Sequence, residues 1–239
     1  MGSLPFPLVL RDDAFAPPEG LHTYYVLAAN GLFLERHTPL FSVSVPAPSG
    51  VPGLHDHAPG LRLRLPRVPA VLVERAVGFF RAVWERWEGE GILLLFYAPS
   101  LGRFALGAPP QVLTGRVEHG CFRAEMHLDY LPCPAPAADY LCVGTMHSHG
   151  AWAAGHSAID QHDEEYEAGL HVTVGHVTRP RPSFVASFVV GGSRFPLDPA
   201  TVLGRFERAR RPLDPWFDQI VLRPRDGAAP AAARDGGRR

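Results

Sequence analysis

The 239-residue chain has no lysine, and all 23 of its basic side chains are arginine. It has only 3 cysteines, an odd number without C-x-x-C spacing, which excludes a disulfide framework and a zinc knuckle. It lacks a run of the ~20 apolar residues that a membrane helix needs, and no basic-then-apolar signal segment opens it. The formal net charge of -1 gives no electrostatic case for binding nucleic acid or an anionic membrane. We therefore expect a cytoplasmic globular protein without nucleic-acid or membrane partners.

The first part of the chain is rich in turns and in short apolar runs. Three segments have the alternation or the β-branched and aromatic composition of strands: residues 23–29, 32–36 and 40–45. The first two flank an Asn30-Gly31 turn signal, which is typical of a β-hairpin. We expect residues 1–66 to form a β-rich N-terminal extension.

The following segment has the pattern of one mixed domain. A helical pattern with a broad apolar face runs from Pro69 to Trp87. Strands are expected at residues 92–97, 104–107, 111–114, 125–130, 140–146, 170–177 and 183–190, and further helices at 160–168 and 201–210. We therefore expect an α/β fold over residues 67–222, with a mixed β-sheet sandwiched by helices. Residues 223–239 are too poor in apolar side chains to order themselves, so we expect a disordered tail.

Two histidines, a serine and an aspartate follow the expected strand 140–146. They are His147, His149, Ser157 and Asp160, with the spacing H-x-H-x(7)-S-x-x-D. On a strand, His147 and His149 are two residues apart, so both rings point to one face. Ser157 and Asp160 are three apart and share one face of a following helix. Because two imidazoles and a carboxylate are the ligands of a catalytic zinc that keeps a position for water, the spacing predicts a zinc site.

A second H-x-H pair is formed by His55 and His57. It lies in a proline- and glycine-rich segment and has no S-x-x-D behind it. We interpret this pair as part of a solvated loop rather than as a metal site.

The full motif resembles that of the JAMM (MPN+) zinc metalloproteases, which include ubiquitin isopeptidases and their prokaryotic relatives. The resemblance implies that His147, His149 and Asp160 bind one Zn²⁺ per chain. It also implies that Ser157 helps to hold the water or the developing oxyanion. The fold it implies is MPN/JAB-like and cytidine-deaminase-like, with a mixed sheet between helices.

The chain departs from the family pattern at two positions. Gly150 stands where many members have proline, and we expect it to loosen the turn. His156 is an unusual neighbour of the motif serine, and it is a rival ligand, a substrate contact or simply an exposed side chain. Neither change removes a ligand.

Short stretches outside the metal motif resemble the bacterial JAB-type family called PRTRC system protein A. They are residues 28–34 (AANGLFL) and Pro109-Pro110-Gln111. Members of that family are encoded beside ThiF/E1-like activating enzymes. The resemblance therefore implies a ubiquitin-like protein or its conjugate as partner, together with E1/E2-like enzymes. The absence of lysine fits either a GC-rich genome or an enzyme that is immune to lysine modification.

JAMM enzymes place a glutamate, the general base, at the first strand after the first helix, and two residues fit here. Glu88 has a glycine three residues later, as in the family's E-x-x-G-x-L pattern. Glu90 lies at the mouth of the apolar strand 92–97, and Gly89 before it has the character of a helix-ending residue. We favour Glu90 as the catalytic base and keep Glu88 as the alternative.

These features predict a zinc-dependent isopeptidase or peptidase that cleaves after the C-terminal glycine of a ubiquitin-like modifier, in a bacterial conjugation system. Glu90 would take a proton from the attacking water and return it to the leaving amine, while Ser157 steadies the oxyanion. The alternative is a catalytically inactive MPN-type scaffold that binds a ubiquitin-like protein or an E1/E2-like partner. A zinc deaminase is disfavoured because the P-C-x-x-C spacing of that class is absent. The Gly236-Gly237 pair in the tail is either part of an unstructured end or a site of self-processing.

Overall fold

In the computed structural model the described residues are 6–47, 57–155, 164 and 167–225. The chain divides into two compact units. The first comprises Met1–Pro66 with Val190–Phe195, and the second comprises Arg67–Val189 with Pro196–Arg239. Among the described residues, no helix combines the length and the apolarity needed to cross a membrane.

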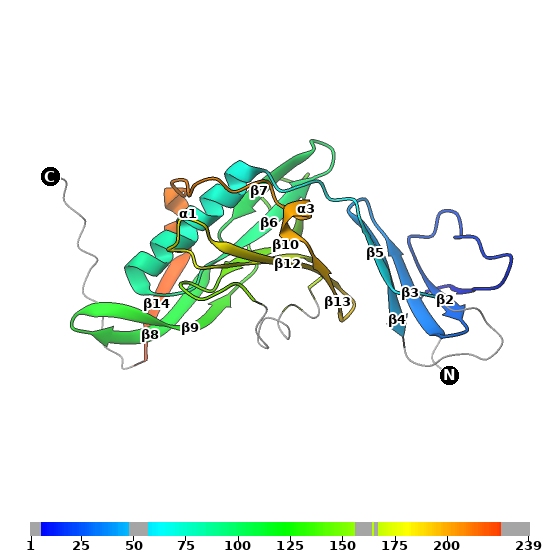
Figure 1. The fold of residues 1–239 in the computed structure, drawn as a ribbon, viewed down its shortest axis with the longest axis horizontal. Coiled ribbons are helices and arrows are strands. Elements are labelled where there is room, and N and C mark those ends of the chain that lie inside the picture. The colour runs from blue at the N-terminus through cyan, green and yellow to red at the C-terminus, as the bar shows by residue number, and fades with distance from the viewer. Residues whose placement is uncertain (1–5, 48–56, 156–163, 165–166, 226–239) are drawn as a thin grey trace. The chain divides into compact units, whose positions relative to one another are not determined.

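The first unit contains a five-stranded sheet in the order β1-β2-β3-β4-β5 (Figure 1). Its strands are β1 (Leu8–Leu10), β2 (Thr23–Ala28), β3 (Gly31–His37), β4 (Phe41–Ala47) and β5 (Gly60–Leu63). β1 runs parallel to β2, and the other neighbouring strands are antiparallel. The three strands expected here are present, and Ala28 pairs with Gly31 across the predicted hairpin turn.

One face of this sheet holds a small apolar core. It contains four buried side chains: Tyr24, Val26, Ala28 and Phe33. The first three alternate along β2 and so point to the same side of the sheet. Val9 and Phe15 pack against them. The alternation of side chains along β2 therefore places three of its residues in this core.

A six-stranded sheet has the order β13-β12-β11-β10-β6-β7, and it belongs to the second unit except for Val190 of β12 and Ser193–Phe195 of β13. Its strands are β6 (Ile92–Ala98), β7 (Arg103–Gly107), β10 (Leu141–Ser148), β11 (Gly169–Gly175), β12 (Ser183–Val190) and β13 (Ser193–Leu197). β10 and β11 run parallel, whereas β10 pairs with β6, β6 with β7, and β11 with β12 in antiparallel fashion. The strand that carries the motif histidines thus lies in the middle of the sheet.

A helix, α1 (Ala70–Trp87), covers one face of this sheet, as Figure 1 shows. It follows the predicted amphipathic pattern and ends where Glu88 takes a left-handed conformation (φ 53°, ψ 29°) and donates its N–H to the Trp84 carbonyl. A Cβ placed on Gly91, just before β6, would lie 3.1 Å from the Phe79 ring and 3.4 Å from the Phe80 ring. Glycine at this position therefore allows the helix to approach the sheet closely.

A third, three-stranded sheet has the order β14-β8-β9. Its strands are β8 (Gln111–Glu118), β9 (Cys121–Tyr130) and β14 (Ile220–Pro224), and β14 runs parallel to β8. Two short helices, α3 (Pro199–Val202) and the 3₁₀ helix η1 (Asp214–Gln219), lie between β13 and β14. Arg223 and Pro224, expected to begin the tail, belong to β14 instead.

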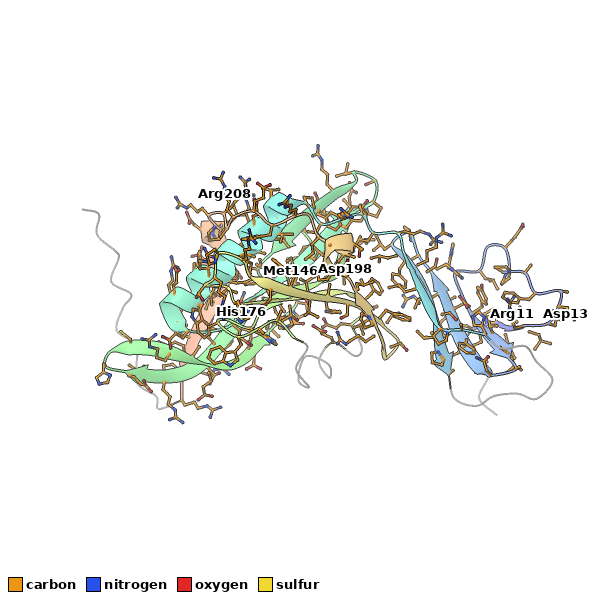
Figure 2. All side chains as sticks on the ribbon, in the orientation of Figure 1. Arg11, Asp13, Met146, His176, Asp198 and Arg208 are labelled. Carbon is orange, nitrogen blue, oxygen red and sulfur yellow. The ribbon has the colours of Figure 1, made fainter. Side chains whose placement is uncertain are left out.

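The segment after α3 packs across α1 (Figure 2). Glu74 of α1 is only 3% exposed and accepts hydrogen bonds from the N–H groups of Glu207 at 3.2 Å and Arg208 at 3.4 Å. Its carboxylate also binds the Arg210 guanidinium, and this hydrogen bond, followed by the two backbone donors, lowers the pKa of Glu74. A Cβ on Gly78 would lie 1.8 Å from the Arg210 carbonyl oxygen, so glycine is required where the segment crosses the helix.

The structure corrects part of the expected fold class. The protein is mainly β, with three mixed sheets, and α1 is the one substantial helix in the described part of the chain. The helix expected at 201–210 is wrong, because α3 ends at Val202 and the N–H groups of the next segment bond to Glu74 rather than within a helix. Most of the helix expected at 160–168 lies outside the described residues.

Candidate metal centre

The motif histidines occupy the face of the six-stranded sheet opposite α1. Along β10, His147 alternates with Met146 and Ser148, so it points to the other side of the sheet. Ser148 bonds to Gly91, whose missing side chain would face the helix. Met146, labelled in Figure 2, is fully buried. His149, two residues after His147, continues the face that α1 does not cover.

The two imidazole rings converge. Nε2 of His147 lies 3.3 Å from Nε2 of His149, and the ring centroids are 5.2 Å apart. Two nitrogen ligands at ~2.0–2.1 Å from one tetrahedral zinc are about 3.3–3.4 Å apart, so this separation fits two ligands of a single ion. The Thr173 hydroxyl lies 3.3 Å from His147 Nε2 and adds an oxygen beside the pair.

The other residues of the motif lie outside the described residues: His156, Ser157 and Asp160. Within the described ranges, no group of three or more His, Cys, Asp or Glu side chains is arranged to hold a metal ion. Of the three expected zinc ligands, the described residues include His147 and His149, whose Nε2 atoms are 3.3 Å apart, and leave out Asp160.

A row of buried polar side chains crosses the histidine face. His147 pairs with Thr173 of β11, and Thr145 pairs with His171, which pairs in turn with Ser187 of β12. All five residues are at most 7% exposed. Buried polar groups are costly unless hydrogen-bonded, and Thr145 Oγ1 lies 2.9 Å from His171 Nδ1. We missed this row from the sequence, although polar residues at every second position of otherwise apolar strands were its signal.

Glu90 comes two residues before the strand that pairs with the histidine strand. β6 and β10 are antiparallel with Ile92 opposite His147, and the Ser148 N–H donates to the Gly91 carbonyl at 3.0 Å. Continuing this register by two residues places Glu90 opposite His149. Directly opposite residues of antiparallel strands share a face, so this extension of the register, two residues beyond the paired residues of β6 and β10, predicts that the half-buried Glu90 side chain borders the two imidazoles.

Two buried side chains hold the backbone next to Glu90. The Ser148 hydroxyl accepts a hydrogen bond from the Gly91 N–H at 3.1 Å. Gln111, which is fully buried, accepts from the Ile92 N–H at 3.0 Å and donates to the Ile92 carbonyl at 3.1 Å. The amide of Gln111 thus replaces a strand partner for Ile92. The N–H of Gly91 and the N–H and carbonyl of Ile92 are therefore all bonded to side chains that lie 19 or 57 residues away in the sequence.

Glu88, the alternative base, has a different environment. It caps the end of α1 in the left-handed conformation, and its side chain is 49% exposed. Its carboxylate forms an ion pair with Arg123 of β9. The ion pair holds Glu88 to the third sheet, whereas the strand register places Glu90 beside His149. The geometry therefore favours Glu90.

Gly150 does not loosen the turn after the histidines, contrary to the expectation. It adopts φ 54°, which proline cannot reach, and a Cβ here would lie 2.1 Å from the Trp84 ring. The turn is fixed by backbone hydrogen bonds from Trp152 to the His149 carbonyl at 3.0 Å and from Val177 to the Gly150 carbonyl at 2.9 Å. The Trp152 ring lies 5.7 Å from that of Trp84 and is 58% exposed, so it offers an aromatic surface close to His149.

In the first unit, His57 is not solvated, which corrects the interpretation from sequence. Its Nε2 lies 2.6 Å from Glu35 Oε1 and 2.7 Å from Ser44 Oγ, and its side chain is 16% exposed. The Asn30 side chain bonds to both the N–H and the carbonyl of His57. Because Ser44 and Glu35 contact the same ring nitrogen, the three do not form a nucleophile relay, which uses both nitrogens. His55 lies outside the described residues.

A second histidine borders the same carboxylate. His37 Nε2 lies 3.6 Å from Glu35 Oε2 and 3.3 Å from the Tyr24 hydroxyl. Burial, and after it the Glu35 charge, raises the pKa of Tyr24, so its hydroxyl stays neutral at physiological pH. These contacts tie His57 to side chains of β3 and β4, and we interpret the residues as a structural cluster.

No protein-family model, curated protein or solved structure matches this chain. The histidine pair and its surroundings are therefore the basis for assigning a function.

Proposed function

We propose that the protein is a zinc-dependent isopeptidase or peptidase of the JAMM type, which cleaves after the C-terminal glycine of a ubiquitin-like modifier. The observation that carries this proposal is the convergence of His147 Nε2 and His149 Nε2, 3.3 Å apart, at the end of β10. Extending the pairing of β6 with β10 would bring Glu90 to the same place. The substrate class and the E1/E2-like partners come from the resemblance of the sequence motif.

The residues fit a zinc ion in kind and in spacing. His147 and His149 would hold it through Nε2, with Asp160 as the third ligand. When bound, Zn²⁺ would polarise the scissile carbonyl and lower the pKa of a water molecule. The Thr173 hydroxyl, 3.3 Å from His147 Nε2, is a further polar group at this position.

The protein's own residues then perform the proton transfers. Glu90 accepts a proton from the attacking water and delivers it to the departing amine, as a general base and then a general acid. Ser148 and Gln111 keep its backbone in register with the histidine strand. Ser157 is proposed to donate a hydrogen bond to the oxygen on which negative charge develops.

The finer fold assignment, an MPN/JAB-like domain, belongs to the same proposal. Its support is the order of elements: α1 precedes β6, packs on one face of the sheet, and leaves the other face to the histidines. β10 lies between an antiparallel and a parallel neighbour, and the metal motif begins at its end.

Metal content is the first test. We expect one zinc per chain in the wild-type protein, and its loss in His147→Ala and in Asp160→Ala, measured by mass spectrometry of the metal. Hydrolysis is then measured with a ubiquitin-like protein, ending in Gly-Gly, joined through its last glycine to a fluorescent amine. Equal zinc in wild type and Asp160→Ala would remove Asp160 as a ligand.

The same experiment separates the enzyme from the inactive scaffold. A scaffold would bind the ubiquitin-like protein yet purify without stoichiometric zinc and release no fluorophore. Zinc-loaded protein that hydrolyses the conjugate, and loses this activity together with zinc in His147→Ala, supports the enzyme.

A further inference from the structure

A buried carboxylate, that of Glu164, lies close to one of the two histidines that we propose as metal ligands. Glu164 precedes β11 in the chain and is only 6% exposed. Its Oε1 lies 3.5 Å from Nδ1 of His171 and 3.8 Å from Nδ1 of His147. A carboxylate buried this deeply is costly unless a cationic or N–H group faces it, and Nδ1 of His147 can supply that N–H.

The two nitrogens of His147 face different partners. Nε2 is directed to His149, at 3.3 Å, and Nδ1 is directed to Glu164. In neutral imidazole one nitrogen carries the proton and the other a lone pair, and the partner of one decides the state of the other. At 3.8 Å the carboxylate is beyond hydrogen-bond distance, but its charge favours a proton on Nδ1 and so leaves the Nε2 lone pair for a metal ion.

A second histidine, His171, lies against Glu164 and is itself held by hydrogen bonds. Nε2 of His171 lies 2.9 Å from the Glu167 carbonyl, which can only accept, so this nitrogen donates. The ring is thereby oriented with Nδ1 toward both Thr145 Oγ1, at 2.9 Å, and the Glu164 carboxylate. The carboxylate is therefore confined between two imidazoles whose own orientations are set by the sheet.

We propose that Glu164 is a positioning residue for the metal site, which holds His147 in the tautomer and orientation that expose Nε2. The inference rests on the proposed function, since it assumes that the histidines bind zinc. Carboxylates that hold metal-binding histidines in this way contribute about 10- to 100-fold to metal affinity. Glu164 itself does not bind the metal.

The test uses the full-length protein with Zn²⁺ or Co²⁺ alone, so it needs no substrate. Zinc affinity is measured by competition with a chelator for wild type, Glu164→Gln and Glu167→Gln. The control removes the same charge three residues away, where the side chain is exposed and its contact is the Tyr130 hydroxyl. We expect Glu164→Gln to bind zinc about 10- to 100-fold more weakly and Glu167→Gln to match the wild type. The visible spectrum of the cobalt-loaded variant should keep the wild-type shape, because the ligands are unchanged.

Three outcomes contradict the inference. Equal zinc affinity in Glu164→Gln and wild type removes the positioning role. Loss of binding together with a changed cobalt spectrum makes Glu164 a ligand instead. A wild-type protein that takes up no zinc overturns the proposed function first, and this inference with it. If Glu164→Gln does not fold, Glu164→Asp decides, because it keeps the charge but shortens the side chain: weakened binding supports the proposal and unchanged binding refutes it.

Discussion

The Oγ atom of Ser148 accepts a hydrogen bond from the N–H of Gly91 at 3.1 Å, in the fully buried space between β10 and β6. Ser148 lies between the two metal-motif histidines, and Gly91 follows Glu90. One hydroxyl therefore links the strand of the proposed ligands to the strand of the proposed base.

Replacing Ser148 with alanine should impair catalysis without releasing zinc. The substitution leaves the Gly91 N–H without this acceptor in a buried place, which costs about 1–3 kcal/mol of unfolding free energy. Displacement of Glu90 should lower kcat about 10- to 100-fold, because proton transfer depends steeply on geometry. The matched control is Thr38→Val, which removes an acceptor of the Leu40 and Phe41 N–H groups in the first unit. A variant with lowered stability and unchanged kcat would argue against the coupling.

The two candidate bases should respond differently to the same substitution. Glu90→Gln is expected to keep its zinc and lose at least ~10²-fold in kcat, because the proton acceptor is removed. Glu88→Gln should retain most activity, since its carboxylate pairs with Arg123 at the end of α1. Parallel measurement of zinc content and turnover checks both variants. The reverse result, with Glu88→Gln inactive, would move the assignment to Glu88.

Gly150 should tolerate alanine poorly. Its φ of 54° costs a side-chain-bearing residue about 1–2 kcal/mol, and the contact at 2.1 Å with the Trp84 ring adds about 1–3 kcal/mol. Gly102 is a matched control, because it has φ 62° but open space around a Cβ. Chemical denaturation should show a clearly larger loss for Gly150→Ala than for Gly102→Ala. Equal losses of unfolding free energy would mean that the Trp84 ring can move aside without destabilising the protein.

Glu74 should make stability depend on acid pH. Its pKa in the folded protein is lowered, mainly by the Arg210 hydrogen bond, from an ordinary value of 4.5. A lowered pKa contributes stability that is present above pH 4.5 and is lost as the pH falls through the folded-state value. Glu74→Gln should therefore be less stable than wild type at pH 7, by about 1–3 kcal/mol, and the difference should shrink below pH 4.5.

Urea denaturation across pH 2–7 measures this effect directly. Glu85→Gln, a change on the exposed side of the same helix, is the control and should follow the wild-type curve. A gap between Glu74→Gln and wild type that stays constant with pH would show that the carboxylate contributes by packing rather than by charge.

Local periodicity was enough to predict α1 and the central strands, because each buries one face determined by neighbours a few residues away. It also predicted that His147 and His149 share a face. The choice between Glu88 and Glu90 needed the register between β6 and β10, which depends on pairing across 57 residues. The local signals, Gly89 as a helix-ending residue and the apolar strand after Glu90, only favoured Glu90 and kept Glu88 as the alternative.

The supporting residues were beyond prediction for the same reason. Gln111 is hydrogen-bonded to the backbone of Ile92, 19 residues away. Glu74 accepts hydrogen bonds from a segment more than 130 residues later, and this segment is not helical, although a helix was expected at 201–210. In the sequence, Glu164 is one of several neighbouring acidic residues and nothing singles it out. Its proximity to His147 appears only in the folded protein. Long-range partners of this kind leave no periodic trace in the sequence.

The central place of β10 also bears on when the site can form during synthesis. Its neighbour β6 lies far upstream, whereas β11 follows it, and Thr173 comes 26 residues after His147. A nascent chain that has exposed both histidines still lacks the parallel partner and the carboxylate behind them. Such non-local pairing is slow to form. The ribosome-bound chain therefore passes through a stage in which His147 and His149 are exposed but β11 and Glu164 are not yet in place. For the zinc site that we propose, metal uptake is then expected only after the sheet is complete, so bound zinc would mark the folded chain.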